Sequence, residues 1–329
     1  MGFSEFGELA MPIGDLKPGD RVDGFFALRK LERREHQGGE RLALELGDAG
    51  GRIDGVMWDG YETVIDELAV GGIVKVRGQV GTFRDRLQIR VDKIRIAVDG
   101  EADPSDFVPR APVDPETLAR LLDEAVARVT DPHLKALLDK LFSAGELRER
   151  YLHAPGAKLW HHNAIGGLAE HSLHMVRICE FACEVYDGLD RDLLICGALL
   201  HDIGKIEQYT VGAMIDYSDE GRLVGHINSG DYRVTEAMRA IEGFPARTER
   251  ALRHLIVSHQ GALEYGSPVL PQTPEAFVLY SADELDSKMG ALRRVAEKTG
   301  DAEWSEWVNL IGRFVFFGRR ETDSAEVEK

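Results

Sequence analysis

The spacing of hydrophobic residues changes once along the chain, near residue 100, and this change limits the folds open to it. Before that point, apolar residues alternate with polar ones or form short runs between glycine-rich turns, which is typical of β-strands. After it, they recur every three or four residues, which is typical of amphipathic helices. Between the two patterns lies 100–113, a stretch rich in proline and aspartate that we expect to be a linker. The sequence therefore predicts a multidomain protein with an all-β domain followed by an all-α domain.

The first domain, 13–99, carries five segments with strand-like patterns and one short helical pattern, 61–68. The strands are expected at 21–31, 41–46, 52–58, 73–80 and 87–96. Five strands with a helix between the third and the fourth is the arrangement of an OB-fold barrel, which we predict here. Another small β-barrel is the alternative.

The second domain, 114–318, reads as a helical bundle between the linker and a charged tail, 319–329. Helices are expected at 115–129, 133–150, 166–186, 191–205, 227–241, 246–259, 274–298 and 303–314. A short tail, 1–12, precedes the barrel.

Charge and hydropathy exclude several classes of protein. No apolar run is long enough to cross a bilayer, and the first residues are acidic where a signal peptide is basic, so we expect a cytoplasmic protein without a membrane partner. The chain has 40 lysines and arginines against 57 aspartates and glutamates, a net charge of −17, which argues against non-specific coating of DNA. Residues 13–99 are near neutral, with 15 basic against 16 acidic residues. The sequence leaves a homo-oligomer open.

Histidines gather in the second domain, where 10 of the chain's 11 lie. His201 and Asp202 follow the apolar segment 193–200, which reads as a buried helix. A desolvated carboxylate beside an imidazole is unfavourable unless it is paired or bound to a metal. Both groups are ligands of divalent transition metals, so the pair indicates a metal site, although polar residues at a helix end would also explain it.

The surrounding motifs GGLAEHSLHM, HDIGK, GHINSG, VSHQG and DELDSK resemble those of the HD-domain metal-dependent phosphohydrolases. The resemblance implies that His171, His201, Asp202 and Asp283 bind one metal ion, and that His226 and His259 bind a second. His254 ranks below His259 as a ligand. The resemblance implies one or two divalent ions and no other cofactor.

The fusion of an OB-like barrel to this domain, together with the stretch AKLWHHNAIGGLAEH, resembles the YhaM-type 3′→5′ exoribonucleases. That resemblance implies single-stranded RNA as substrate, nucleoside 5′-monophosphates as products and Mn²⁺ as the favoured ion, with Mg²⁺, Co²⁺, Fe²⁺ and Ni²⁺ as alternatives. One departure is visible: His259 is followed by Gln260, where this family commonly has a second histidine.

Three residues are predicted to act in catalysis beside the ions. Asp202 would bridge two cations that make hydroxide available from water, and Lys205 would offset charge on the phosphoryl oxygens. His162, or its neighbour His161, would donate a proton to the leaving oxygen or contact the phosphate.

The barrel is predicted to bind the strand through aromatic stacking and a cationic track. The residues expected to contact nucleic acid are Phe25, Arg29, Arg33, Trp58, Phe83, Arg84 and Arg86. Any one of these aromatic residues could instead fill the barrel core.

We therefore expect a metal-dependent phosphodiesterase that degrades single-stranded RNA, or single-stranded DNA, from the 3′ end. An HD-type small-nucleotide phosphohydrolase or cyclic-dinucleotide phosphodiesterase is one alternative, and a non-catalytic OB-type nucleic-acid-binding protein is another.

Overall fold

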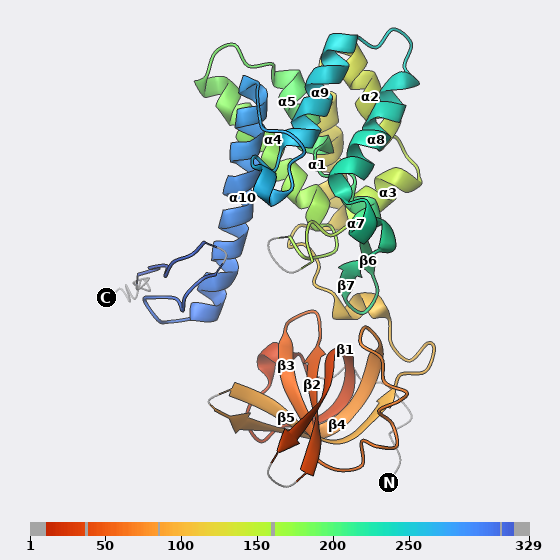
Figure 1. The fold of residues 1–329 in the computed structure, drawn as a ribbon, viewed down its shortest axis with the longest axis vertical. Helices are drawn as coiled ribbons and strands as arrows, with labels where there is room; N and C mark the ends of the chain where they lie inside the picture. Colours follow the sequence, from red (N-terminus) through yellow and green to blue (C-terminus); the bar gives the residue numbers. More distant parts are fainter. Residues whose placement is uncertain (1–10, 37–38, 85, 159–161, 310, 319–329) are drawn as a thin grey trace, which may run out of the picture. The chain divides into compact units, whose positions relative to one another are not determined.

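The computed structural model describes residues 11–36, 39–84, 86–158, 162–309 and 311–318 (Figure 1). The chain forms two compact units. The first runs to Pro112 and also includes Glu207–Arg222, and the second comprises Val113–Ile206 and the chain from Leu223 onward. The segment Glu207–Arg222 thus interrupts the helical unit in sequence and belongs to the barrel unit.

The barrel is built from five strands. They are β1 (Arg21–His36), β2 (Gly39–Gly47), β3 (Arg52–Met57), β4 (Ile73–Phe83) and β5 (Arg86–Ile96). The strands close in the order β1-β2-β3-β5-β4, with β3 and β5 parallel and the other pairs antiparallel. This closed five-stranded barrel is the predicted OB-fold.

Alternation along the strands separates the barrel core from its outer face. In β2, Leu42, Leu44 and Leu46 are buried in the core at every second position, as a strand with one inward face requires. In β1, Phe26 and Leu28 also point into this core.

The intervening residues of β1, Phe25 and Ala27, face outward but are not exposed. They pack with Phe107 of the short 3₁₀ helix η2 (Pro104–Phe107) and with Ala213 of the inserted segment. The expected helix at 61–68 is instead a run of turns, with hydrogen bonds from Val64 N and Ile65 N to the Tyr61 carbonyl oxygen.

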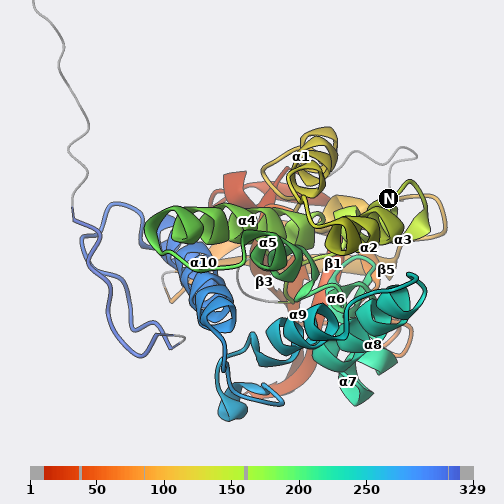
Figure 2. The same cartoon turned by 90° about the horizontal axis from the view of Figure 1, so that it is seen from above.

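The second unit is helical. The α-helices of the chain are α1 (Pro115–Ala127), α2 (Pro132–Phe142), α3 (Glu146–His153), α4 (Gly167–Val185), α5 (Arg191–Leu200), α6 (Lys205–Gln208), α7 (Asp219–Leu223), α8 (His226–Arg239), α9 (Ala246–Ser258) and α10 (Pro274–Thr299). The remaining elements are the 3₁₀ helices η1 (Ile13–Asp15) and η3 (Leu263–Tyr265) and the hairpin β6 (Tyr209–Val211) and β7 (Ile215–Tyr217). Within the helical unit, α4 and α5 are central, with α1 packed on α4, α9 on α5 and α10 on both (Figure 2).

Local signals explain where several helices begin. The side chains of Asp114, Asp131, Asp190 and Thr273 accept hydrogen bonds from backbone N–H groups in the first turns of α1, α2, α5 and α10. No helix in the described part of the chain is long and apolar enough to cross a membrane.

In the second domain, two predicted helices were wrong, and the helix predicted at 191–205 ends at Leu200. The segment 133–150 is divided between α2 and α3, because Ser143 is extended and Gly145, a poor helix former, precedes α3. The described residues of 303–314 form no helix, because backbone bridges join Trp304 to Phe316 and Val308 to Arg313.

Candidate metal centre and nucleic-acid surface

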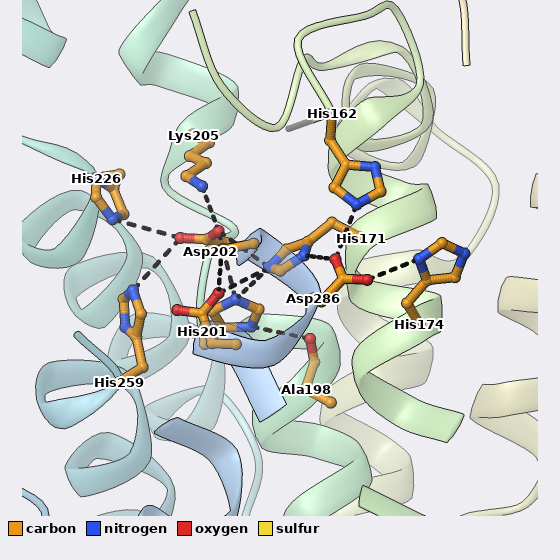
Figure 3. Close-up of polar contacts among 12 residues, drawn as sticks. His162, His171, His174, Ala198, His201, Asp202, Lys205, His226, His259 and Asp286 are labelled. Atoms are coloured by element: carbon orange, nitrogen blue, oxygen red, sulfur yellow. Dashed lines mark hydrogen bonds and ion pairs between the residues drawn. The ribbon is translucent and has the colours of Figure 1, made fainter. Parts of the chain in front are cut away.

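The helical unit brings together the six side chains predicted to bind metal. His171 lies on α4, Asp283 on α10 and His226 on the first turn of α8, while His201 and His259 directly follow α5 and α9. Asp202 lies between the imidazoles (Figure 3). Ligands that are up to 112 residues apart in sequence, at positions 171 and 283, thus converge on one centre.

One half of this cluster consists of His171, His201 and Asp283, whose ligand atoms lie within 4.8 Å of one another. His171 Nε2 is 3.3 Å from Asp283 Oδ1 and 3.2 Å from His201 Nε2. The other half consists of Asp202, His226 and His259, whose ligand atoms also lie within 4.8 Å of one another. Asp202 Oδ1 is 3.4 Å from His226 Nε2 and 3.5 Å from His259 Nε2, and Asp202 Oδ2 is 3.3 Å from His201 Nε2. Asp202 therefore contacts both halves.

Backbone hydrogen bonds fix the orientation of two of these imidazoles. His201 Nδ1 lies 3.0 Å from the Ala198 carbonyl oxygen, and His259 Nδ1 lies 2.7 Å from the Ile256 carbonyl oxygen. A carbonyl oxygen only accepts, so Nδ1 carries the hydrogen in both rings. When these histidines are neutral, each Nε2 has a lone pair, as a metal ligand must. That of His259 lies 3.0 Å from Gln260 Nε2 and accepts a hydrogen bond from it, a contact that a bound ion would replace.

The cluster has the properties of a cation site. Asp202 Oδ1 is buried and accepts no hydrogen bond from the part of the chain that the structure describes. A buried carboxylate oxygen without a donor is unfavourable, and so are lone pairs that face it. A divalent cation would satisfy these groups together, and imidazole with carboxylate is a donor set that transition metals accept. The residues present therefore fit one or two divalent ions.

The pKa shifts agree with this donor set. Burial lowers the pKa of His226 to about 3, against the opposing effect of Asp202, and burial also lowers the pKa of His259. Both rings are therefore neutral near pH 7 and able to donate a lone pair. Burial raises the pKa of Asp202, but Lys205 and His201 outweigh it and hold that pKa well below its usual range, so the carboxyl group is ionised.

Lys205 and Gly204, from the HDIGK motif, complete this side of the cluster. Lys205 is buried, and its Nζ lies 2.5 Å from Asp202 Oδ2. Gly204 packs against the first turn of α8: a Cβ at this position would lie 2.0 Å from the His226 carbonyl oxygen and 2.6 Å from Gly230 N. Only glycine allows this approach, which brings His226 to Asp202.

A second set of polar residues supports the cluster from behind, and sequence reasoning missed two of them, Asp286 and Glu170. Asp286 Oδ2 lies 2.7 Å from His171 Nδ1 and 2.8 Å from His162 Nε2, and Asp286 Oδ1 lies 2.9 Å from His174 Nδ1. Burial raises the pKa of Asp286, but hydrogen bonds from His162, His171 and His174 outweigh it and hold the pKa well below its usual range. Asp286 is therefore an ionised carboxylate that orients His171.

His162 does not face the cluster directly. Its Nδ1 lies 2.8 Å from Glu170 Oε2 and its Nε2 contacts Asp286, so carboxylates hold both ring nitrogens. Its backbone φ of 52° is unusual for a residue other than glycine, which indicates a conformation held by these contacts. His161 lies outside the described residues. His254 is also apart from the cluster, since its Nε2 accepts a hydrogen bond from Gln272 N at 2.9 Å.

The residues predicted to bind nucleic acid are placed differently from one another on the barrel. Trp58 follows β3 and is 41% exposed, with the Arg41 guanidinium 5.1 Å from its ring centre. Phe83 and Arg84 lie where β4 turns into β5, and Phe83 is 50% exposed. OB-folds commonly bind ligands on the face of strands 2 and 3 and on the loop between strands 4 and 5.

The other four predicted residues divide into exposed and covered ones. Arg33, near the end of β1, and Arg86, at the start of β5, are exposed. Phe25 is only 3% exposed, so its ring is not open to a base. Arg29 is the extra residue of a bulge in β1 and lies over Gly47, where burial and then Arg52 lower its pKa.

Comparisons with known proteins match each unit separately. The family described as OB-fold nucleic acid binding domain matches residues 29–97, and the HD domain family matches residues 168–288. Among solved structures, the second OB-fold domain of replication protein A from Methanococcus maripaludis is 24% identical over 27% of this chain and 96% of that chain, with a TM-score of 0.24. A replication protein A heterotrimer bound to ssDNA is 18% identical over 27% of this chain and 73% of that chain, with a TM-score of 0.22. From the two family matches, the chain joins an N-terminal OB-fold nucleic-acid-binding domain to a C-terminal HD domain, which supports a metal-dependent nucleic-acid hydrolase in general.

Proposed function

We propose that the protein is a metal-dependent 3′→5′ exonuclease that hydrolyses single-stranded RNA, and that it releases nucleoside 5′-monophosphates. The observation that carries the proposal is the position of Asp202, whose two oxygens face imidazoles from both halves of the ligand cluster. A carboxylate between two ligand sets is suited to hold two cations close together, which is an arrangement used to cleave phosphodiesters.

The residues of the cluster would hold the ions in two sets. His171, His201 and Asp283 form one set, His226 and His259 form the other, and Asp202 is shared. Bound cations would supply an activated water for attack on phosphorus and would neutralise charge on the phosphoryl oxygens. Mn²⁺, Fe²⁺, Co²⁺ and Ni²⁺ suit a site of imidazole and carboxylate ligands better than Mg²⁺, which prefers oxygen ligands.

The chain's own groups have separate tasks around that site. Lys205, whose Nζ lies beside the Asp202 carboxylate, would stabilise charge on the substrate phosphate. The contacts of His162 favour a positioning role, through Asp286 and His171, over the proton donor expected from the sequence. The OB barrel would hold the strand through Trp58 and Phe83 while the terminal nucleotide is removed.

A time course on single strands labelled at either end tests the proposal. With added Mn²⁺, a 3′-labelled strand should lose its label at once as mononucleotide, while the 5′-labelled strand shortens in single steps. Cleavage in the interior, or release of label first from the 5′ end, would exclude a 3′→5′ exonuclease. Turnover of mononucleotides or cyclic dinucleotides with no cleavage of strands would favour the small-nucleotide alternative.

A further inference from the structure

A cavity of about 800 Å³ opens beside the metal-ligand cluster, within the helical unit. His259 and Asp283, two of the six proposed ligands, form part of its wall, so the cavity is continuous with the cluster. Its other walls come from α10, from Gln260 and Tyr265 after α9, and from the segment 311–316, which follows α10. The volume falls within the range of about 300–1,000 Å³ that small-ligand sites usually have.

Aromatic rings form part of the lining of this cavity. The four rings are those of Tyr265, Tyr280, Phe314 and Phe316. Phe314 and Phe316 are 56% and 55% exposed, which is unusual for two large apolar side chains so close in sequence. Exposed rings at the edge of a polar cavity are suited to stack on a planar ligand.

These rings are held in place before any ligand binds. Trp304 lies against Phe316 with ring centres 4.9 Å apart, and Trp307 lies against Phe314 at 5.3 Å. The backbone bridge between Trp304 and Phe316 fixes the same pairing. Because rigid aromatic groups lose little entropy on binding, such a preformed surface favours a stacked ligand.

Tyr280, which also lines the cavity, is held by contact with the chain that follows α9. A Cβ on Gly261 would lie 2.0 Å from Cε2 of Tyr280, so the ring occupies the space that only glycine leaves. Gly261 also has a φ of +75°, which glycine adopts without strain.

Two cationic side chains line the same cavity. Lys288 forms an ion pair of 2.6 Å with Glu284, one turn earlier on α10. Arg313 Nε donates to the Ile311 carbonyl oxygen, and Arg313 forms no ion pair with a carboxylate of the described residues. Its guanidinium therefore keeps its charge available for an anionic ligand.

We propose that this cavity binds the 3′-terminal nucleotide of the substrate, with its base among the aromatic rings, Arg313 near its phosphate, and the scissile bond at the ligand cluster. The inference rests on the proposed function and deepens it by assigning the residues that select a nucleotide end. The cavity offers aromatic rings to stack on a base and a cation to bind a phosphate. Because it shares a wall with the ligand cluster, these features together fit a nucleotide.

Binding of AMP, a product of the proposed reaction, tests the site without any turnover. By calorimetry, AMP should bind the wild-type protein, and ribose 5-phosphate, which has no base, should bind at least about tenfold more weakly. Phe314→Ala should weaken AMP binding about 5- to 150-fold, the effect of removing one stacking ring. Phe277→Ala is the matched control, because Phe277 is 57% exposed on α10 and does not line the cavity; it should change nothing.

Equal binding of AMP and ribose 5-phosphate would overturn the proposal, and so would an unchanged AMP affinity in Phe314→Ala. If that variant leaves AMP affinity unchanged but dissociates an oligomer in sedimentation, the rings form a contact between copies of the chain instead. Arg313→Gln should weaken AMP more than it weakens adenosine, and this second variant decides the question if Phe314→Ala does not fold.

Hydrolysis then separates this proposal from the proposed function. The loss of kcat/KM in Phe314→Ala should appear on a normal strand and vanish on a strand whose 3′-terminal residue is abasic, since the ring and the base act on each other. Equal losses on both strands would mean damage to the fold and would contradict the assignment. If the wild-type protein cleaves no strand, the exonuclease proposal fails, while AMP binding still decides what the cavity holds.

Discussion

Asp286 Oδ2 lies 2.7 Å from Nδ1 of His171, on the side of the ring opposite the ligand cluster. Asp283, one turn earlier on α10, contacts Nε2 of the same ring at 3.3 Å. One helix therefore supplies a carboxylate to each nitrogen of His171, one as a proposed metal ligand and one to hold the ring.

Asp286→Asn should weaken Mn²⁺ binding about 10- to 100-fold, since carboxylates behind a ligating histidine usually have effects of that size. The substitution keeps the shape of the side chain and removes its charge. Calorimetric titration of the metal-free protein with Mn²⁺ measures the change in affinity. Glu297→Gln, at an exposed position of the same helix, should bind Mn²⁺ like the wild type. Unchanged affinity in Asp286→Asn would show that the carboxylate does not support the ligand.

Metal binding should become tighter as pH rises, because His171 must lose a proton to act as a ligand. Burial lowers the pKa of His171, but hydrogen bonds to Asp283 and Asp286 outweigh it and raise the pKa to about 9 in the metal-free protein. His226 and His259, whose pKa values are lowered, should release no proton. The logarithm of the apparent affinity should rise with pH and level off above about pH 9.

The same shift predicts how the stability of the metal-free protein depends on pH. A histidine whose pKa is raised on folding stabilises the fold fully below its ordinary pKa of 6.5, and this contribution disappears as the pH rises through about 9. Thermal unfolding in the presence of a chelator, measured from pH 6.5 to about 9, should show this decline in stability. In saturating Mn²⁺ the decline should be absent, and its persistence there would contradict the assignment of His171 as a ligand.

Gly204→Ala should separate Asp202 from His226. The new Cβ would meet the His226 carbonyl oxygen at 2.0 Å, so the first turn of α8 must move, at a cost of about 1–3 kcal/mol. We expect lower stability and a larger loss of Mn²⁺ affinity than the stability change explains. Gly212→Ala, where nothing lies within 4 Å of the added Cβ, should bind Mn²⁺ normally. Equal metal affinity in both variants would mean that this close approach does not build the site.

Trp58→Ala and Phe83→Ala should each weaken binding of single-stranded RNA by about 1–3 kcal/mol, the value of one stacked base. Binding is best measured in an Asp202→Asn background, so that cleavage does not interfere. Phe25→Ala should instead destabilise the barrel, because its ring is buried against Phe107 and Ala213. Phe181→Ala, at an exposed position in the helical unit, is the control. If only Phe25→Ala affects binding, the predicted surface is wrong.

The barrel could be predicted because alternation along short strands carries both the strand positions and the inward face, as in Leu42, Leu44 and Leu46. The sequence did not show that the outer face of β1 is also covered. From the sequence, Phe25 was predicted to be a stacking residue. In the fold, Phe107 and Ala213 pack over its ring. Contacts made by an insertion as distant as Glu207–Arg222 leave no local pattern.

The order of the motifs predicted the six residues of the ligand cluster. It did not predict the residues behind the cluster that hold the ligands in place. Asp286 stands three residues after Asp283 and His174 three after His171, so both pairs share a helix face, a signal that could have found Asp286. The prediction of a helix at 303–314 was wrong. It rested on Trp304 and Trp307, which stand three residues apart, as on one face of a helix. Pairing of these rings with Phe316 and Phe314 across a turn is a tertiary effect that overrides local propensity.

Restoration of activity to metal-stripped protein tests the central claim most directly. Protein freed of metal by a chelator should cleave no labelled single-stranded RNA, and cleavage should return as Mn²⁺ is added in near-stoichiometric amounts. Asp202→Asn, checked by circular dichroism for an intact fold, should neither retain Mn²⁺ nor regain cleavage. Full hydrolysis by the metal-stripped protein, or by Asp202→Asn, would contradict the account.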